Sequence, residues 1–144
     1  MKSVYKENYN LPSLVNLWGD YIDWEKRRIA ENGFLKGTLE KNNCHNIFEA
    51  GLWDGCDSIY LLKEGFDVTS NELDLLFTKK AQQNAREANV KLSITSFDWR
   101  TLDSHFKKET FDALLCLGNT LTYLFTKVDQ MKTLKNFYNI LRKN

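Results

Sequence analysis

Acidic, glycine, aromatic and amide residues follow each short apolar stretch in the part of this chain after residue 45. The first stretch ends in Glu49, with Gly51 and Gly55 close behind. An acidic side chain beside two glycines suits a loop in which a ligand approaches the backbone and the N-terminus of a helix. The same residues also suit an ordinary turn between a strand and a helix, which is the simpler interpretation of this loop alone.

The next two stretches end in groups that can hold a nucleoside. Glu72, after the second stretch, can accept hydrogen bonds from both hydroxyls of a ribose. Asp98 and Trp99, after the third, combine an acceptor for an exocyclic amine with a flat ring for an adenine face. The structural alternatives are a glutamate that caps the next helix and a core tryptophan beside a surface aspartate.

The fourth stretch ends in Leu117, Gly118, Asn119 and Thr120. Its glycine permits close approach of the backbone, and the Asn119 amide offers both a donor and an acceptor to a small ligand. An adenine nucleoside needs contacts from several neighbouring loops. Four such ends in succession therefore favour a nucleoside site over four unrelated turns.

Regular elements must bring these ends together. Short apolar runs predict strands, and the spacing of apolar residues between and after them predicts helices. We expect strands within 46–55, 66–72, 90–99 and 111–119, and helices at 56–65, 73–89 and 126–144. The nearly continuous apolar run of the last strand predicts that this strand is covered on both faces.

The N-terminal part of the chain is predicted to be helical. Apolar residues recur at mostly three- and four-residue intervals from Leu14 to Trp24, behind a cap at Ser13, and predict one long helix or two over 13–42. We expect one domain over 1–144. Within it, N-terminal helices occupy 1–45 and a nucleoside-binding α/β core occupies 46–144.

The alternation of strands and helices determines the fold class. It predicts a doubly wound, Rossmann-like parallel sheet in the strand order 3-2-1-4, with helices on both faces. Ligands of such sheets bind at the carboxyl ends of the strands, near the switch in strand order. The four ends described above are therefore expected at one edge of one sheet.

The composition is that of an ordinary globular protein. Its 144 residues are 42% hydrophobic and 27% charged, which suffices for one core without a disulfide or a metal. The 20 basic and 19 acidic residues leave a net charge of +1, which does not attract nucleic acid or anionic lipid. Three widely spaced cysteines fit neither a disulfide framework nor a zinc site. Residues 1–10 lack the apolar stretch of a signal peptide, so we expect a cytoplasmic protein without membrane or nucleic-acid partners.

Taken in order, four motifs resemble a known family. They are an acidic-Ala-x-x-x-x-Gly loop at 49–55, GFDVTSNE at 65–72, FDWRTL at 97–102 and FDALLCLGNTLTYL at 111–124. The arrangement resembles the class I S-adenosylmethionine-dependent methyltransferases, and most of all the glycine and glycine–sarcosine N-methyltransferases. The N-terminal helical segment is similar too, in Trp18, Ile22-Asp23-Trp24, Arg27, Glu31 and Phe34, so the resemblance covers nearly the whole chain.

The resemblance implies S-adenosylmethionine as the cofactor and a role for each strand end. By this likeness, the ribose is held by Glu72, and the adenine by Asp98 and Trp99. The methionyl carboxylate is gripped by Arg27. The remaining family positions, which lie around the methionyl chain, are Glu49, Gly51, Gly55, Leu117 and Asn119.

The expected reaction is the in-line attack of a small amine, such as glycine or sarcosine, on the methyl group. This chemistry requires mainly positioning and the exclusion of water, because a neutral amine needs no strong base. Asn119 is a better candidate than Tyr21 or Tyr123 for orienting a small zwitterion, because its amide can both donate and accept hydrogen bonds. Tyr21 and Tyr123 can line the acceptor side, although core packing is the alternative for both. The two histidines, His45 and His105, are expected at the surface or in turns.

Two features depart from the family. Trp53 stands where the family loop usually has glycine, and its indole can either stack over the ligand or fill the ligand's place. Family members also continue after the last helix with a Pro-Gly-rich turn and three further strands, whereas this sequence ends in LRKN. The strand at 111–119 is thus expected at an edge whose backbone groups invite pairing.

We therefore expect a homo-oligomer, or a partner chain at the edge of the fourth strand. The alternative is a monomer, in which the closing helix covers this side through Leu134, Phe137, Ile140 and Leu141. Two alternatives to methyl transfer stay open at this point. One is a non-catalytic or cofactor-binding module that acts through oligomerisation or a partner chain, and the other is an enzyme that degrades S-adenosylmethionine.

Overall fold

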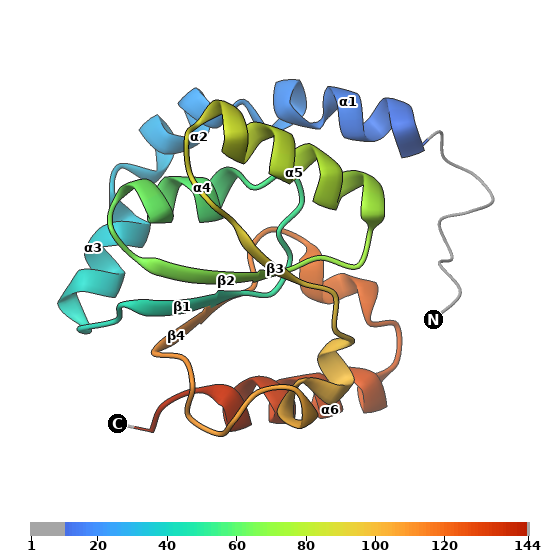
Figure 1. The fold of residues 1–144 in the computed structure, drawn as a ribbon. Coiled ribbons are helices and arrows are strands. Elements are labelled where there is room, and N and C mark those ends of the chain that lie inside the picture. The colour runs from blue at the N-terminus through green and yellow to red at the C-terminus, as the bar shows by residue number, and fades with distance from the viewer. Residues whose placement is uncertain (1–10, 144) are drawn as a thin grey trace.

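A parallel sheet of four strands forms the centre of the protein in a computed structural model that describes residues 11–143 (Figure 1). The strands are β1 (Asn46–Glu49), β2 (Asp67–Asn71), β3 (Ser93–Thr95) and β4 (Ala113–Leu115), in the order β3-β2-β1-β4. This arrangement confirms the doubly wound fold and its predicted strand order. The prediction for residues 1–10 lies outside the described residues.

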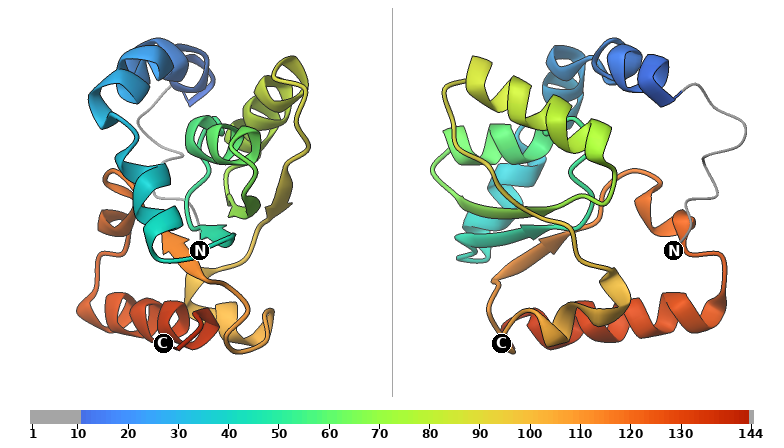
Figure 2. Two further views of the ribbon diagram at one scale, coloured as in Figure 1. Left: turned by 90° about the vertical axis from the view of Figure 1, so that its left-hand side faces the viewer. Right: turned by 45° about the vertical axis from the view of Figure 1, so that its right-hand side comes forward.

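Helices cover both faces of the sheet, as predicted. Helices α4 (Cys56–Lys63) and α5 (Leu75–Glu87) lie on one face, and α6 (Lys127–Ile140) lies on the other (Figures 1 and 2). Gly65 follows α4 with a φ of 89°, a conformation that glycine adopts without a steric penalty. None of the helices in the range 11–143 is long and apolar enough to cross a membrane.

The N-terminal segment contains three helices, so the prediction of one or two was wrong. They are α1 (Leu11–Ile22), α2 (Trp24–Glu31) and α3 (Phe34–Lys41). Asp23 breaks the segment with a left-handed φ of 50°, and its carboxylate accepts a hydrogen bond from the backbone N–H of Lys26 at 3.1 Å. Asn32 and Gly33 break it again, with φ values of 49° and 73°. Ser13 lies inside α1 and does not cap it.

The third and fourth strands are shorter than predicted because polar caps and turns end the extended backbone. Asp98 caps a 3₁₀ helix, η2 (Trp99–Ser104), so Trp99 begins a helix rather than ending a strand. After β4 the chain turns at Gly118, whose φ is 62°, into a second 3₁₀ helix, η3 (Thr120–Tyr123). Within β4 only Leu115 is buried, so this strand is less covered than its apolar run predicts.

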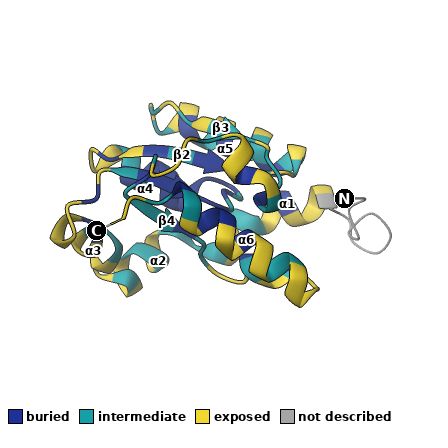
Figure 3. Ribbon diagram, turned by 90° about the horizontal axis from the view of Figure 1, so that it is seen from below, coloured by how far each residue is buried: buried dark blue, intermediate teal, exposed yellow. Residues whose placement is uncertain are grey.

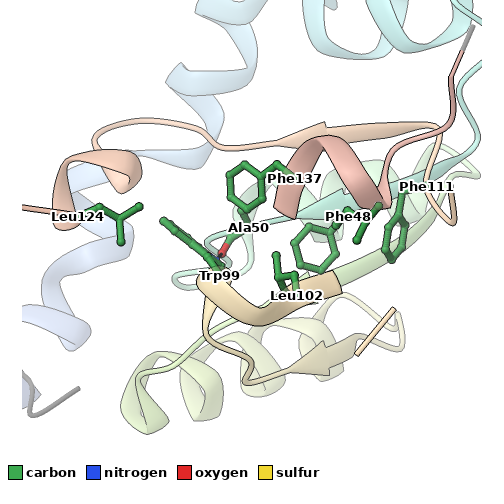
Figure 4. Packing of buried hydrophobic residues seen from close by; sticks show 8 residues of the cluster. Phe48, Ala50, Trp99, Leu102, Phe111, Leu124 and Phe137 are labelled. Atoms are coloured by element: carbon green, nitrogen blue, oxygen red, sulfur yellow. Dashed lines mark hydrogen bonds between the residues drawn. The ribbon is translucent and has the colours of Figure 1, made fainter. Parts of the chain in front are cut away.

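The core has one part on each side of the sheet. Ile47 and Phe48, neighbours in β1, are both fully buried on opposite faces, as the alternation of a strand requires. Phe48 packs with Phe111 and Phe137 in the part that faces α6 (Figure 4). Ile47 packs with Leu61 of α4 on the other side. Seen from below, the buried residues concentrate in the sheet and the exposed ones on the outer surface of the helices (Figure 3).

The edge at β4 is partly covered by the segment that follows α6. Leu141 forms a parallel bridge with Phe111, whose N–H donates to the Ile140 carbonyl at 3.0 Å and whose carbonyl accepts from the Arg142 N–H at 2.8 Å. Phe137 and Ile140 of α6 are buried against the sheet, whereas Leu134 is 45% exposed. The closing helix therefore packs on this side as the monomer alternative expects, and the oligomeric state stays a prediction.

Candidate functional site

A cavity of about 480 Å³ opens at the carboxyl ends of the strands. Loops after all four strands contribute to its wall, which is the place where parallel α/β sheets bind their ligands. Its volume lies in the range of small-molecule sites. The predicted site residues that line it are Gly51, Trp53, Glu72, Asp98 and Trp99.

Glu72 lies at the end of β2, where two backbone amides hold its carboxylate. Its Oε2 accepts a hydrogen bond from the Trp53 N–H at 2.9 Å, and its Oε1 accepts one from the Asp74 N–H at 2.9 Å. Burial raises the pKa of Glu72, and these two amides act in the opposite direction. Each carboxylate oxygen has a second acceptor position, so the fixed group suits the hydroxyls of a ligand.

Asp98 reaches the cavity from the loop after β3. Its Oδ1 accepts from the Arg100 backbone N–H at 2.9 Å, and its Oδ2 accepts from the Arg100 guanidinium at 2.5 Å. Arg100 also donates to Asp129 of α6 at 3.1 Å. The hydrogen bonds from Arg100 lower the pKa of Asp98, which keeps this acceptor ionised. A ligand amine would therefore share Asp98 with Arg100.

Trp99 is a core residue that also lines the cavity, and its adenine-binding role stays a prediction. It is only 9% exposed, and its ring packs edge-on against Phe137 at 5.6 Å between centroids (Figure 4). Its indole N–H donates to the carbonyl of Ala50 at 2.8 Å. The same residue lines the cavity, so it belongs to the core and also provides wall for a ligand.

Trp53 forms an aromatic group with residues of two helices. Its ring lies nearly parallel to that of Trp18 in α1, with centroids 4.6 Å apart and an angle of 10°, and edge-on to Phe77 in α5 at 5.0 Å. The indole N–H donates to Thr120 Oγ1 at 3.3 Å. Its φ of 53° is unusual for a bulky residue, so these contacts hold a strained backbone.

Gly51 is required where the loops after β1 and β4 meet. A Cβ atom at this position would lie 2.5 Å from Thr120 Cγ2, closer than real atoms approach. Thr120 in turn donates from Oγ1 to the Leu117 carbonyl at 2.5 Å. The absence of a side chain at Gly51 therefore allows the two loops to form one wall.

Glu49 lies behind this wall, not on it. It is 2% exposed and accepts a hydrogen bond from the hydroxyl of Ser58, which lies 2.7 Å from the hydroxyl of Ser70. Burial, and secondarily the charge of Asp57, raises the pKa of Glu49 to about 8. Its position indicates a buried link between β1 and α4.

Arg27 and Gly55 also lie outside the lining. The Arg27 guanidinium is paired with Asp57 of α4, with Nη2 2.6 Å from Oδ2 and Nε 3.1 Å from Oδ1. Arg28 contacts the same carboxylate, so two arginines of α2 hold the start of α4. Gly55 precedes α4 with a φ of 90°, and an added Cβ would lie 3.3 Å from that of Ala81.

Of the residues predicted for the acceptor side, Tyr123 of η3 lines the cavity, whereas Tyr21 and Asn119 do not. Tyr21 is 79% exposed, with its ring 5.6 Å from that of Trp18. Asn119 is exposed, and its carbonyl accepts the Thr122 hydroxyl at 2.5 Å. Leu117 is half-buried at the turn before it. The roles of these residues stay predictions.

Sequence reasoning missed two residues that shape the cavity. Asn71 is 1% exposed, and its Oδ1 accepts from the Phe97 N–H at 2.8 Å, so it ties β2 to the loop after β3. A polar residue inside a buried strand, directly before Glu72, is the signal for it. Phe77 lies in the first turn of α5, close behind the helix cap at Asp74. Its apolar periodicity alone does not distinguish it from the core.

A second hollow and two histidines lie elsewhere in the described chain. A polar hollow of about 580 Å³ lies between α1, α2 and α5, but none of the predicted site residues lines it. His45 and His105 are both exposed. No group of three or more His, Cys, Asp or Glu side chains within 11–143 is placed to hold a metal ion.

Comparison with known proteins agrees with this geometry. The chain is 34% identical over 140 residues to the glycine/sarcosine N-methyltransferase of Aphanothece halophytica, covering 97% of this chain and 52% of that protein. It is 36% identical over 137 residues to the enzyme of the same name from Halorhodospira halochloris, covering 95% and 50%. Human glycine N-methyltransferase is 34% identical to the chain over 141 residues, a match that covers 89% of this chain and 48% of that protein. The chain thus spans about half the length of these curated relatives.

Solved structures share the fold. A protein of Pyrococcus horikoshii superposes with a TM-score of 0.71 at 18% identity, over 83% of this chain and 53% of that one. An S-adenosylmethionine-dependent methyltransferase of Clostridium acetobutylicum superposes with a TM-score of 0.67 at 19% identity, over 76% of this chain and 44% of that protein. The family model of the methyltransferase domain matches residues 47–144, which include β1 from Ile47 on, the other three strands and every strand end that lines the cavity. The chain therefore belongs to the methyltransferase-domain family.

Proposed function

We propose that this chain binds S-adenosylmethionine in the cavity at the strand ends and contributes to the transfer of its methyl group to a small amine, glycine or sarcosine. The observation that carries the proposal is the Glu72 carboxylate, held at the end of β2 by the amides of Trp53 and Asp74. A carboxylate fixed in this way offers acceptors to the two hydroxyls of a ribose.

The remaining wall fits the rest of an adenosyl group. Asp98 provides an ionised acceptor one strand away from Glu72, and Trp99 and Ala50 provide apolar surface between the strand ends. Buried Asn71 fixes the two loops that carry these acceptors. The acceptors and the flat apolar surface are the features that an adenine nucleoside needs from a protein.

Bound in this cavity, the ligand supplies a methyl group on a positively charged sulfur. The residues of the chain then have to orient the ligand and exclude water, since attack by a neutral amine needs no strong base. The rings of Trp53, Phe77 and Trp99 make part of the wall apolar. Gly51 lets the loops after β1 and β4 close against each other.

The amine class rests on the relatives. Proteins named glycine/sarcosine N-methyltransferase and glycine N-methyltransferase match most of the chain at 34–36% identity. A neutral amine lone pair also suits a site with no histidine among the lining residues that the structure describes. Asn119 and Tyr21 remain the predicted residues of the acceptor side.

A transfer assay tests this function. The protein is incubated with S-adenosylmethionine labelled in the methyl group and with glycine, sarcosine or acetate, which lacks the amine. We expect label in the products of glycine or sarcosine and none with acetate. Binding of S-adenosylmethionine without transfer to either amine would overturn the acceptor assignment, and failure to bind would overturn the whole proposal.

A further inference from the structure

The charge of the cavity is one-sided. Its lining includes three carboxylates, from Glu72, Asp74 and Asp98, of which Asp98 is paired with Arg100 behind the wall. Among the described residues that line it there is no lysine, arginine or histidine. A concave site lined by one sign of charge attracts ligands of the opposite sign. The cavity therefore favours a ligand that carries positive charge.

Trp53 is next to the acceptor for the ribose. Its backbone N–H donates to Glu72 Oε2 at 2.9 Å, so the residue adjoins any sugar that this carboxylate binds. In the proposed ligand, one substituent of the ribose carries the sulfur. A ribose bound with this substituent towards the loop after β1 would bring the sulfur close to Trp53.

The indole of Trp53 is a fixed part of the wall. Trp18 covers one of its faces, with centroids 4.6 Å apart, and Trp18 itself does not line the cavity. Trp53 itself lines the cavity, and its ring also contacts that of Tyr123, with centroids 5.8 Å apart. The hydrogen bond to Thr120 Oγ1 at 3.3 Å and the edge contact with Phe77 hold the ring in this orientation.

We propose that Trp53 is a specificity-determining residue whose indole contacts the positively charged sulfur and so favours S-adenosylmethionine over the neutral thioether S-adenosylhomocysteine. The inference rests on the proposed function. Tryptophan is the aromatic side chain that attracts cations most strongly, through the negative face of its ring. The two ligands share the adenosyl and amino-acid parts and differ in the charge of the sulfur, so this contact acts on one of them only.

Calorimetric titration with both ligands tests the proposal on the wild type, Trp53→Phe and Trp53→Leu. Trp53→Leu should weaken the binding of S-adenosylmethionine by about 2- to 30-fold, the range of a cation–π contact. The same variant should bind S-adenosylhomocysteine with an affinity within about twofold of the wild type, because the neutral sulfur forms no cation–π contact. Trp53→Phe retains an aromatic face and should keep most of the preference. Phe34→Leu is the control, because it removes an exposed aromatic ring of α3 that does not line the cavity and should leave both affinities unchanged.

The other outcomes separate the possible errors. If Trp53→Leu weakens the binding of both ligands equally, the inference is overturned, and Trp53 contributes only to the shape of the cavity. Tighter binding of both ligands would mean that the indole occupies ligand space, which also overturns it. If neither Trp53→Phe nor Trp53→Leu yields a folded protein, a wild type that binds the thioether more tightly than the sulfonium overturns the inference. A wild type that binds neither ligand would overturn the proposed function itself.

Discussion

The backbone N–H of Trp53 donates a hydrogen bond to Glu72 Oε2 at 2.9 Å, and this contact joins the loop after β1 to the acid after β2. Trp53 adopts a left-handed φ of 53°, which is unfavourable for a bulky residue unless its surroundings hold it. The position where the sequence departs from the family and the acid expected to bind ribose therefore form one structural unit. A change in the loop is expected to move the acceptor.

Gly51→Ala should destabilise the protein. The added Cβ would lie 2.5 Å from Thr120 Cγ2, and overpacking of this kind costs about 1–3 kcal/mol. Thr120→Ser removes the clashing methyl and keeps the hydroxyl that bonds Trp53 and Leu117. The double variant should therefore recover most of the lost free energy of unfolding, measured in urea. Additive losses in the double variant would contradict this account of the contact.

Glu49 should make stability fall as the pH rises. Its pKa in the folded protein is about 8 against an ordinary value of 4.5, so the folded state holds a proton that the unfolded chain releases. The free energy of unfolding should thus decrease between about pH 4.5 and about pH 8. Glu49→Gln keeps an acceptor for the Ser58 hydroxyl and does not titrate, so its stability should decrease less over this range. Urea unfolding at both ends of the range checks this, and identical pH dependence in the two proteins would disprove it.

Arg27 can reach a ligand carboxylate only if it shares or leaves its pair with Asp57, at 2.6 Å. If it does, Arg27→Gln should weaken the binding of S-adenosylmethionine by roughly 10- to 150-fold, the contribution of a charged hydrogen bond. Methylthioadenosine, which lacks the amino-acid part, should bind the variant and the wild type alike. Calorimetry with both ligands compares them. Equal weakening of the two would assign Arg27 to the support of α4 and not to the ligand.

The surface of α6 and the edge of β4 are expected to associate with another chain. Val128, Met131 and Tyr138 of α6 are 75%, 59% and 63% exposed, and β4 is the last strand of the described sheet. Exposed apolar area beside an edge strand favours pairing. Light scattering at micromolar concentration should show a mass above that of one chain, and Met131→Glu should lower it. A monodisperse mass near 16.9 kDa for the wild type would refute the association.

Local sequence patterns predicted most of the fold. Apolar runs that end in polar or glycine residues mark all four strands, and Glu72 and Asp98 are found at the strand ends that this pattern assigns to them. The boundaries depend on single residues that adopt unusual conformations or cap helices. Asp23 interrupts a helical periodicity with a left-handed φ, and Asp98 starts a 3₁₀ helix where a strand was expected.

The parts of the site that sequence could not predict depend on contacts between distant residues. Arg27 is held by Asp57, 30 residues later, so its guanidinium lies away from the cavity that the family resemblance assigns to it. The ring of Trp53 is oriented by Trp18 of α1 and by Thr120 of η3. Neither partner is marked by a local motif around Trp53, so the sequence alone does not predict the orientation of its ring.

The most direct test of the account is a calorimetric titration of S-adenosylmethionine into the wild type, Glu72→Ala and Glu25→Gln. Glu25 is an exposed acid of α2 that does not line the cavity, so its variant controls for the change in net charge. The wild type and Glu25→Gln should bind with similar affinity. Because Glu72→Ala loses the acceptor, it should bind S-adenosylmethionine roughly 5- to 150-fold more weakly, or by about 1–3 kcal/mol. Binding of Glu72→Ala as tight as that of the wild type would contradict the assignment of this cavity to the adenosyl ligand.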